Sequence, residues 1–246
     1  MAQRTAVVTG GIGGLGTAIC TSLAQAGHRV VAVDLGSRDD RLAQFRADVA
    51  GLDIAFSALD VGDFEACAAF VRDIESSHGG IDILVNGAGI TRDTTLRKME
   101  RAQWESVLRV NLDGVFNLCR HAVEGMVARG FGRIVNISSV NGQTGQFGQT
   151  NYSAAKAGMH GFTMALAREV ARKGVTVNSV SPGYCETALV MAMPDRIRAG
   201  IVEQVPVGRL GRPGEIARVV DFLVAEDAGF ITGANIPVNG GLFMSF

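Results

Sequence analysis

Short apolar runs rich in β-branched residues alternate with longer amphipathic stretches along almost the whole chain. Several runs are apolar on both faces, which is typical of parallel strands buried inside a sheet. This alternation predicts β-α-β units with right-handed crossovers, and therefore an α/β fold with a Rossmann-type, doubly wound parallel sheet of about seven strands. The runs are residues 6–8, 30–33, 54–56, 81–85, 134–137, 175–180 and 235–238.

The stretches between the runs have helical periodicity, and the chain shows no linker or internal repeat. Its 246 residues, 47% of them hydrophobic, can build one large core, so we expect a single domain covering residues 1–246. Residues 183–212 follow no clean period, and an irregular segment that long is usually functional or mobile. We therefore expect residues 184–212 to be a small lid insertion over the substrate. The expected helices are residues 15–26, 64–77, 103–128, 154–172 and 213–225.

Charge and composition narrow the class of partner. The formal net charge is -1 and no basic tract is present, so nucleic acid is not an expected partner. No apolar run reaches the roughly 18 residues that span a bilayer, and a strand begins almost at once, so neither a membrane partner nor a signal peptide is expected. The four cysteines are far apart without metal-ligand spacing, which predicts no metal site and inert thiols in a reducing compartment. We expect a cytoplasmic protein.

A glycine-rich turn follows the first predicted strand and opens the first predicted helix. Glycines let the backbone turn tightly and approach a pyrophosphate, whose charge is met by the amides and dipole of the helix N-terminus. A glycine-rich stretch alone could be only a tight connection, but the strand–turn–helix context favours a dinucleotide site. The residues predicted to bind the phosphates are Gly10, Ile12, Gly13, Gly14, Leu15 and Gly16.

Asp34 ends the second predicted strand. An acid at this position would hydrogen-bond the adenosine ribose hydroxyls and repel the 2′-phosphate of NADPH, although it could also be an ordinary turn residue. Two like charges about 4 Å apart repel by roughly 4 kcal/mol at the dielectric of a protein surface. We therefore predict NADH as the preferred cofactor and NADPH as the alternative. Arg38 and Arg41 oppose this prediction, because either could reach a phosphate.

Two further loops at predicted strand ends fit the same cofactor pocket. Asp60 and Val61 follow the third strand and would place polar groups near the adenine. The fourth strand is followed by small residues that would let the backbone lie under the cofactor, although a simple turn would also use them. These residues are Asn86, Gly87, Ala88 and Gly89.

Tyr152 and Lys156 are four residues apart on a predicted helix and share one face. An ammonium beside a phenol favours the phenolate, which would lower the pKa of the tyrosine from about 10 and suit it to proton transfer. Ser139 ends the preceding strand, at the sheet edge where open α/β folds bind ligands. Asn111 is an amide in mid-helix, where it is disfavoured. A Tyr–Lys pair on the surface of a helix would explain Tyr152 and Lys156 alone, and an Asn with its hydrogen bonds satisfied within the helix would explain Asn111 alone. Together with Ser139, these residues predict a catalytic group.

These motifs resemble, in order and spacing, the short-chain dehydrogenase/reductase family over essentially the whole chain. One departure is Gly87, where the family has a second asparagine. The resemblance implies a nicotinamide-dependent oxidoreductase with further cofactor contacts from Pro182, Gly183 and Cys185. The matching motifs are the glycine turn, Asn86-x-Ala88-Gly89, Asn111, Ser139, Tyr152-x-x-x-Lys156 and Ser181-Pro182-Gly183.

The family resemblance also implies a role for each catalytic residue. Tyr152 would be the proton donor in the reducing direction, and Lys156 would lower its pKa and bind the nicotinamide ribose. Ser139 would hydrogen-bond the substrate carbonyl and stabilise the developing oxyanion. Asn111 would hold a water that links Lys156 to solvent.

The segment before Tyr152 narrows the substrate. Residues 136–152, 89–99, 181–184 and 239–242 resemble the acetoacetyl-CoA reductases of polyhydroxybutyrate synthesis, which reduce acetoacetyl-CoA to (R)-3-hydroxybutyryl-CoA. These reductases commonly use NADPH, so Asp34 is a departure. A polar surface loop would also explain the amides before Tyr152. Besides Ser139 and Tyr152, the implied substrate-binding residues are Asp93, Gln146, Phe147, Gly148, Gln149, Gly183 and Tyr184.

Two other functions stay open. A 3-oxoacyl-acyl carrier protein reductase shares the catalytic residues and would need a basic patch for an acidic carrier, with Arg129 and Arg172 as candidates. A non-catalytic dinucleotide-binding sensor is opposed by the intact catalytic residues. The helices that carry Asn111 and Tyr152 have apolar residues on more than one face, which could be core alone. The family resemblance implies that these helices pair between subunits of a homotetramer.

Overall fold

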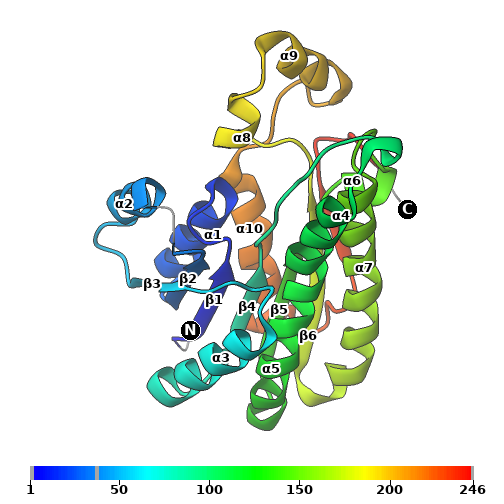
Figure 1. Cartoon of the computed structure of the whole chain (residues 1–246). Helices are drawn as coiled ribbons and strands as arrows, with labels where there is room; N and C mark the ends of the chain where they lie inside the picture. The colour runs from blue at the N-terminus through cyan, green and yellow to red at the C-terminus, as the bar shows by residue number, and fades with distance from the viewer. Residues whose placement is uncertain (1–2, 37–38, 245–246) are drawn as a thin grey trace.

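The computed structural model describes residues 3–36 and 39–244, and within them seven parallel strands form one sheet (Figure 1). The strand order is β3-β2-β1-β4-β5-β6-β7, so the order changes direction between β1 and β4. Open α/β sheets bind ligands beyond the carboxyl ends of the strands at such a switch point. The predicted fold class is confirmed. The strands are β1 (Thr5–Thr9), β2 (Arg29–Asp34), β3 (Ile54–Ala58), β4 (Ile83–Asn86), β5 (Gly132–Ile137), β6 (Val175–Pro182) and β7 (Asn235–Val238).

Helices cover both faces of the sheet (Figure 1). One face packs against α1 (Gly14–Gln25), α2 (Asp39–Asp48) and α10 (Pro213–Val224). The other face packs against α3 (Phe64–His78), α5 (Gly114–Arg129) and α7 (Thr150–Val170). In the part of the chain that the structure describes, no helix is both long and apolar enough to cross a membrane.

The helices on both faces of the sheet explain why the strand sequences are runs of apolar residues. In β1, Ala6 and Val8 lie in the core under α1 and α10, whereas Val7 lies in the core under α3, α5 and α7. All three side chains are fully buried. Because successive residues of a strand point to opposite faces, a strand that is covered on both sides must be apolar at every position.

The helix predicted over residues 103–128 is divided in two. The structure has α4 (Arg101–Leu108), a π-helical segment η2 (Arg109–Asp113) and then α5. Across η2, Gly114 N donates to Arg109 O, the i to i+5 pattern of a π-helix. Asn111 lies inside this wide turn and is fully buried. Such local widening is frequent at functional sites.

Residues 184–212, which the sequence leaves irregular, contain two short helices. These are α8 (Ala188–Met191) and α9 (Asp195–Gln204), which stand beyond the carboxyl edge of the sheet at the top of Figure 1. The two ends of the segment are joined, because Gly211 N donates to Tyr184 O (2.9 Å) and Glu186 N donates to Gly211 O (2.8 Å). The segment therefore leaves the sheet and returns to it at the same place, and we call residues 184–212 the excursion.

Candidate active site

A cavity of about 500 Å³ lies at the carboxyl ends of β4, β5 and β6. It extends from Leu15, in the first turn of α1, to Tyr152 and Lys156 on α7. Of the residues predicted to bind the phosphates, Leu15 therefore shares one continuous space with the predicted catalytic residues, whereas Gly10, Ile12, Gly13, Gly14 and Gly16 are not among its lining residues. The sequence-predicted residues that line it are Leu15, Gly87, Gly89, Asp93, Ser139, Gln149, Tyr152, Lys156, Pro182, Gly183, Tyr184 and Cys185.

Lys156 lies beneath Tyr152, one turn further along α7. Its side chain is only 3% exposed, and Nζ lies 5.7 Å from the centre of the Tyr152 ring. Nζ donates a hydrogen bond to Ile137 O at the end of β5 (2.7 Å). Burial lowers the pKa of Lys156 to about 8 because the charged ammonium is removed from water. Its proton can therefore leave and return close to neutral pH.

The pKa of Tyr152 moves in the direction opposite to the sequence expectation. Burial raises it, a hydrogen bond with Ser139 lowers it, and the charge of Asp93 raises it again. Lys156 is not among the causes of this shift, which is set mainly by desolvation of the phenol, and the Lys156 ammonium is directed to Ile137 O. A raised pKa keeps the phenol protonated at neutral pH, which is the state that a proton donor requires.

Ser139 follows β5 at the cavity wall, where its hydroxyl is oriented by the next turn. Its Oγ accepts a hydrogen bond from Asn141 N (3.1 Å), which uses a lone pair and leaves the hydroxyl hydrogen for another acceptor. The neighbouring Ser138 donates instead to Lys156 O (3.0 Å) and joins the end of β5 to α7. These bonds hold the serine and the Tyr152 helix in one arrangement.

Asn111 holds the loop that follows β4. Its Nδ2 donates to Ile90 O (2.9 Å), and its Oδ1 accepts from Ile90 N (2.8 Å). A Cβ placed on Gly89 would lie 3.2 Å from Asn111 Oδ1 and 3.7 Å from Lys156 Nζ. Gly89 thus separates the amide from the ammonium, and a larger residue there would press on both. The side-chain amide is used by the Ile90 main chain.

The glycine turn and the loop after β4 approach so closely that side chains would not fit. A Cβ on Gly10 would lie 2.7 Å from Gly87 O, and a Cβ on Gly16 would collide with Gly10 O. Thr9 Oγ1 accepts from both Gly87 N and Ala88 N (3.0 Å each), which fixes the two loops together. This glycine cradle, with α1 starting at Gly14, fits the pyrophosphate of a dinucleotide cofactor.

Three predicted cofactor residues have buried side chains. Ile12 and Val61 are 3% and 5% exposed and belong to the two cores, so only their main chains are available to a cofactor. Asn86 is 2% exposed, and its Nδ2 donates to Asn136 Oδ1 (2.8 Å). These residues support the binding loops from within.

The predicted adenosine end carries two acids and two arginines. Asp34 ends β2, and its Oδ1 accepts from Leu35 N (2.8 Å). Asp60 accepts hydrogen bonds from Arg109 Nη1 (2.9 Å) and from Gly62 N (2.9 Å). Partial burial acts to raise the pKa of the Asp60 carboxyl, but these bonds and the charge of Arg109 together lower it below its ordinary value. Arg41 Nη2 lies 4.0 Å from the position of a Cβ on Gly13, beside the glycine turn. Arg38 lies outside the described residues.

The loop before Tyr152 contributes less to the cavity than the sequence suggests. Gln149 lines it, but Gln146, Phe147 and Gly148 are not among its lining residues. Phe147 is 87% exposed and lies between Gly145 and Gly148, both of which have a positive φ. Phe147, one of the implied substrate-binding residues, therefore does not contact the cavity in this structure.

Sequence reasoning missed two groups of lining residues. Asn141, two positions after Ser139, was detectable in principle as a polar residue at the carboxyl edge of the sheet. The excursion between residues 184 and 212 contributes side chains that no periodicity could identify, because α8 has only four residues. The missed residues are Ile90, Thr91, Arg92, Ile137, Ser138, Val140, Asn141, Thr187, Leu189, Val190 and Met193.

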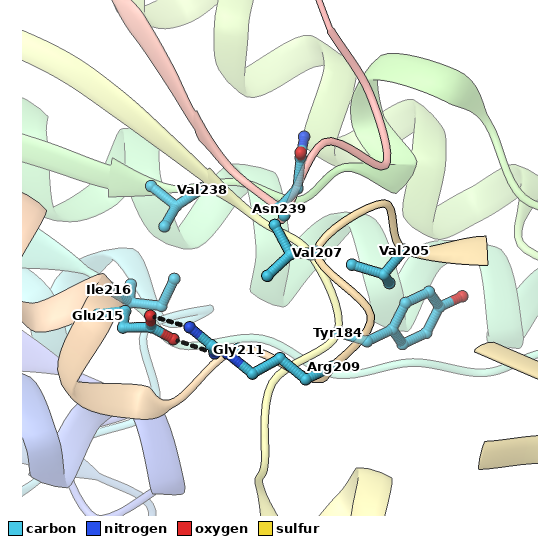
Figure 2. Close-up of a pocket in the computed structure, with 11 residues that line it drawn as sticks. Tyr184, Val205, Val207, Arg209, Gly211, Glu215, Ile216, Val238 and Asn239 are labelled. Carbon is cyan, nitrogen blue, oxygen red and sulfur yellow. Dashed lines mark hydrogen bonds and ion pairs between the residues drawn. The ribbon is translucent and has the colours of Figure 1, made fainter. Parts of the chain in front are cut away.

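A smaller cavity of about 120 Å³ shares Gly183 and Tyr184 with the first. Figure 2 shows Arg209 reaching Glu215 across one edge, through two hydrogen bonds of 2.9 and 2.7 Å. Glu215 also accepts from Arg212 N (2.7 Å), and the bonds from Arg209 and Arg212 hold its pKa at about 2. This ion pair joins the end of the excursion to the first turn of α10.

The chain is similar to known proteins over its whole length. The family model described as short chain dehydrogenase matches residues 4–197. An acetoacetyl-CoA reductase of Allochromatium vinosum is 58% identical over 98% of this chain and 99% of its own length. An acetoacetyl-CoA reductase of Cupriavidus necator is 53% identical over 99% of this chain and 100% of its own. A 3-oxoacyl-[acyl-carrier-protein] reductase of Vibrio cholerae is 44% identical over 98% of both chains.

Proposed function

The chain belongs to the short-chain dehydrogenase/reductase family, and we propose that it reduces acetoacetyl-CoA to (R)-3-hydroxybutyryl-CoA in polyhydroxybutyrate synthesis. The observation that carries this proposal is the single cavity that holds Ser139, Tyr152 and Lys156 at one end and Leu15, in the first turn of α1, at the other. The high identity to two acetoacetyl-CoA reductases supports the choice of ketone. As a family member, the protein is an oxidoreductase that uses an NAD(P)-type cofactor.

The proposed chemistry assigns one task to each side chain. A nicotinamide cofactor, when bound, would supply the hydride for the ketone carbon. Tyr152 donates its phenolic proton to the ketone oxygen, and the raised pKa keeps that proton available. Ser139 donates a hydrogen bond to the same oxygen as negative charge develops on it. The product is an alcohol, and Tyr152 is left as a phenolate.

Lys156 returns the proton to Tyr152. Its pKa of about 8 lets it exchange protons near neutral pH, and its place beneath the ring keeps it close to the phenolate. Both ends of the Asn111 amide are used by the Ile90 main chain. We propose that Asn111 holds the water that would link Lys156 to solvent.

We propose NADH as the preferred cofactor. Asp34 lies at the end of β2, where its carboxylate would bind the ribose hydroxyls and repel a 2′-phosphate. Arg41 lies beside Gly13 of the glycine turn, where it would meet the pyrophosphate. Comparing kcat/KM for NADH with kcat/KM for NADPH tests this preference, and a higher value for NADPH would reject it.

We propose that residues 184–212 act as a lid within one domain of residues 1–246. Leu189 and Val190 of α8, with Met193, supply apolar side chains to the cavity wall beside Tyr184. Their position over the cavity supports a role in excluding water from the reacting carbonyl. The four buried free thiols support a reducing, cytoplasmic location.

We propose a homotetramer that pairs through α5 and α7. Of the apolar residues in these helices, Val115, Leu118 and Met159 belong to the core. Phe116 on α5 and Met164 on α7 are 46% and 53% exposed, and a subunit interface would cover them. Sedimentation velocity should give the mass of four chains, and a monomer would reject the proposal.

The alternative functions are separated by the choice of substrate. Of the two arginines suggested for a carrier-protein patch, Arg129 is bound to Ile81 O (2.6 Å) and to Asp82 (3.4 Å), which favours a structural role. We expect kcat/KM for acetoacetyl-CoA to exceed that for the acyl carrier protein thioester. The reverse order would identify a carrier-protein reductase. No turnover of either compound would favour the dinucleotide-binding sensor.

A further inference from the structure

Three polar side chains form a hydrogen-bonded row along the wall of the catalytic cavity. Gln149 Nε2 donates to Asp93 Oδ2 (2.7 Å), and Asn141 Nδ2 donates to Gln149 Oε1 (2.9 Å). All three line the same cavity as Ser139 and Tyr152. The row joins the loop after β4, the turn after β5 and the start of α7. Asn141 belongs to none of the family motifs.

The charge of Asp93 sets the direction of this row. A side-chain amide can present either its oxygen or its NH₂ group, and its neighbours decide which. The Asp93 carboxylate only accepts, so it must face Nε2 of Gln149. Turning that amide over would bring two oxygens together at Asp93 and two NH₂ groups together at Asn141. The Asp93 carboxylate therefore sets the orientation of Gln149, and the bond from Asn141 holds the oxygen end of that amide in place.

The row leaves hydrogen-bond donors for a ligand. Each NH₂ group has two hydrogens, and the row uses one from Gln149 and one from Asn141. A β-ketoacyl thioester has a second carbonyl group two carbons from the ketone, and that oxygen can only accept. With the ketone oxygen at Ser139 and Tyr152, the remaining N–H groups have the chemistry needed to bind the thioester oxygen.

We propose that Asn141 is a positioning residue that determines specificity, because it holds Gln149 with an N–H free for the second carbonyl group of a β-ketoacyl thioester. This inference rests on the proposed function. Asn141 is only 9% exposed, and a Cβ on the next residue, Gly142, would lie 2.9 Å from the Lys156 main chain. The turn is therefore packed tightly against α7, and the Asn141 side chain starts from a fixed backbone.

The replacement Asn141→Leu tests the side-chain amide alone. Leucine has a similar volume without donors, and the main-chain bond from residue 141 to Ser139 Oγ is kept. We expect KM for acetoacetyl-CoA to rise about tenfold, the value of one hydrogen bond, with kcat changed less than about twofold. This split arises because the thioester carbonyl is bound alike in the ground and transition states. A fall in kcat with unchanged KM would overturn the proposal.

A matched control lies on the same short helix, α6 (Asn141–Thr144). Gln143 does not line the cavity, and its buried Oε1 has no hydrogen-bond partner among the described residues. Gln143→Leu should therefore leave KM for acetoacetyl-CoA unchanged. A KM that rises equally in the Gln143 and Asn141 variants would overturn the proposal, because the effect would then come from general loosening of the helix.

Asp93→Asn acts on the other end of the row and is an exposed substitution. An amide there can face Gln149 with either end, so the orientation of Gln149 is released and KM should again rise severalfold. Because both changes act through Gln149, KM for the double variant should equal that of whichever single variant has the higher KM. Multiplied effects would overturn the proposal, as would an unchanged KM in Asp93→Asn alone. A wild-type enzyme inactive on acetoacetyl-CoA would instead reject the proposed function.

Discussion

Lys156 should make the folded protein less stable at neutral pH than a variant without its charge. Its side chain is 3% exposed, and burial lowers its pKa from 10.5 to about 8. In the unfolded chain the lysine keeps its ordinary pKa. One pKa unit corresponds to about 1.4 kcal/mol, so the shift corresponds to a cost of about 3 kcal/mol when the buried group is charged.

The sign of the pH dependence follows from proton binding. Between about pH 8 and pH 10.5 the folded state has lost the Lys156 proton, whereas the unfolded state still holds it. Because the unfolded state binds more protons, the free energy of unfolding rises with pH in this window. The full cost is therefore present below pH 8 and is relieved by pH 10.5.

Lys156→Met removes the charge and keeps an unbranched side chain. It also loses the hydrogen bond to Ile137 O, worth about 1 kcal/mol. We therefore expect the variant to be more stable than the wild type by about 2 kcal/mol at pH 7, and to lose that advantage near pH 10. Turnover should be lost.

Urea unfolding of both proteins at pH 7 and pH 9.5 measures this difference. Lys173→Met is the matched control, because Lys173 is exposed and has no burial to relieve. A stability difference between wild type and Lys156→Met that stays constant with pH would refute the burial argument. So would a Lys173 variant with the same pH dependence.

Two further predictions address the cofactor and the oxyanion. Asp34→Ala should raise the ratio of kcat/KM with NADPH to kcat/KM with NADH by about tenfold or more, because a like charge is removed from the 2′-phosphate position; an unchanged ratio would show that Asp34 does not select the cofactor. Ser139→Ala should lower kcat for acetoacetyl-CoA by about 10² to 10³, because one donor to the developing oxyanion is lost. A kcat within about threefold of wild type would remove Ser139 from the mechanism.

The fold could be predicted because burial on both faces of the sheet leaves a direct record in the sequence. Val7 and Val8 face opposite cores, so both positions must be apolar, and the same holds along the central strands. The lid helices left no such record, since α8 is only four residues long and α9 has no buried residue in this structure.

The active site was predictable by position but not by environment. The strand ends placed Ser139 and the glycine turn at one edge, and helical spacing placed Tyr152 over Lys156. The π-helical turn at Asn111 was not predictable, because it accompanies a tertiary contact with Ile90. The raised pKa of Tyr152 and the outward ring of Phe147 also depend on burial and loop geometry that spacing does not encode.

The central claim is that Tyr152 delivers the proton in a nicotinamide-dependent reduction of acetoacetyl-CoA. It is tested most directly by measuring acetoacetyl-CoA-dependent NADH oxidation by wild type and Tyr152→Phe, with NADH binding to each followed by fluorescence titration. We predict turnover by the wild type, a loss of at least about 10³ in kcat for the variant, and unchanged NADH affinity. Turnover by Tyr152→Phe close to that of the wild type would contradict the account.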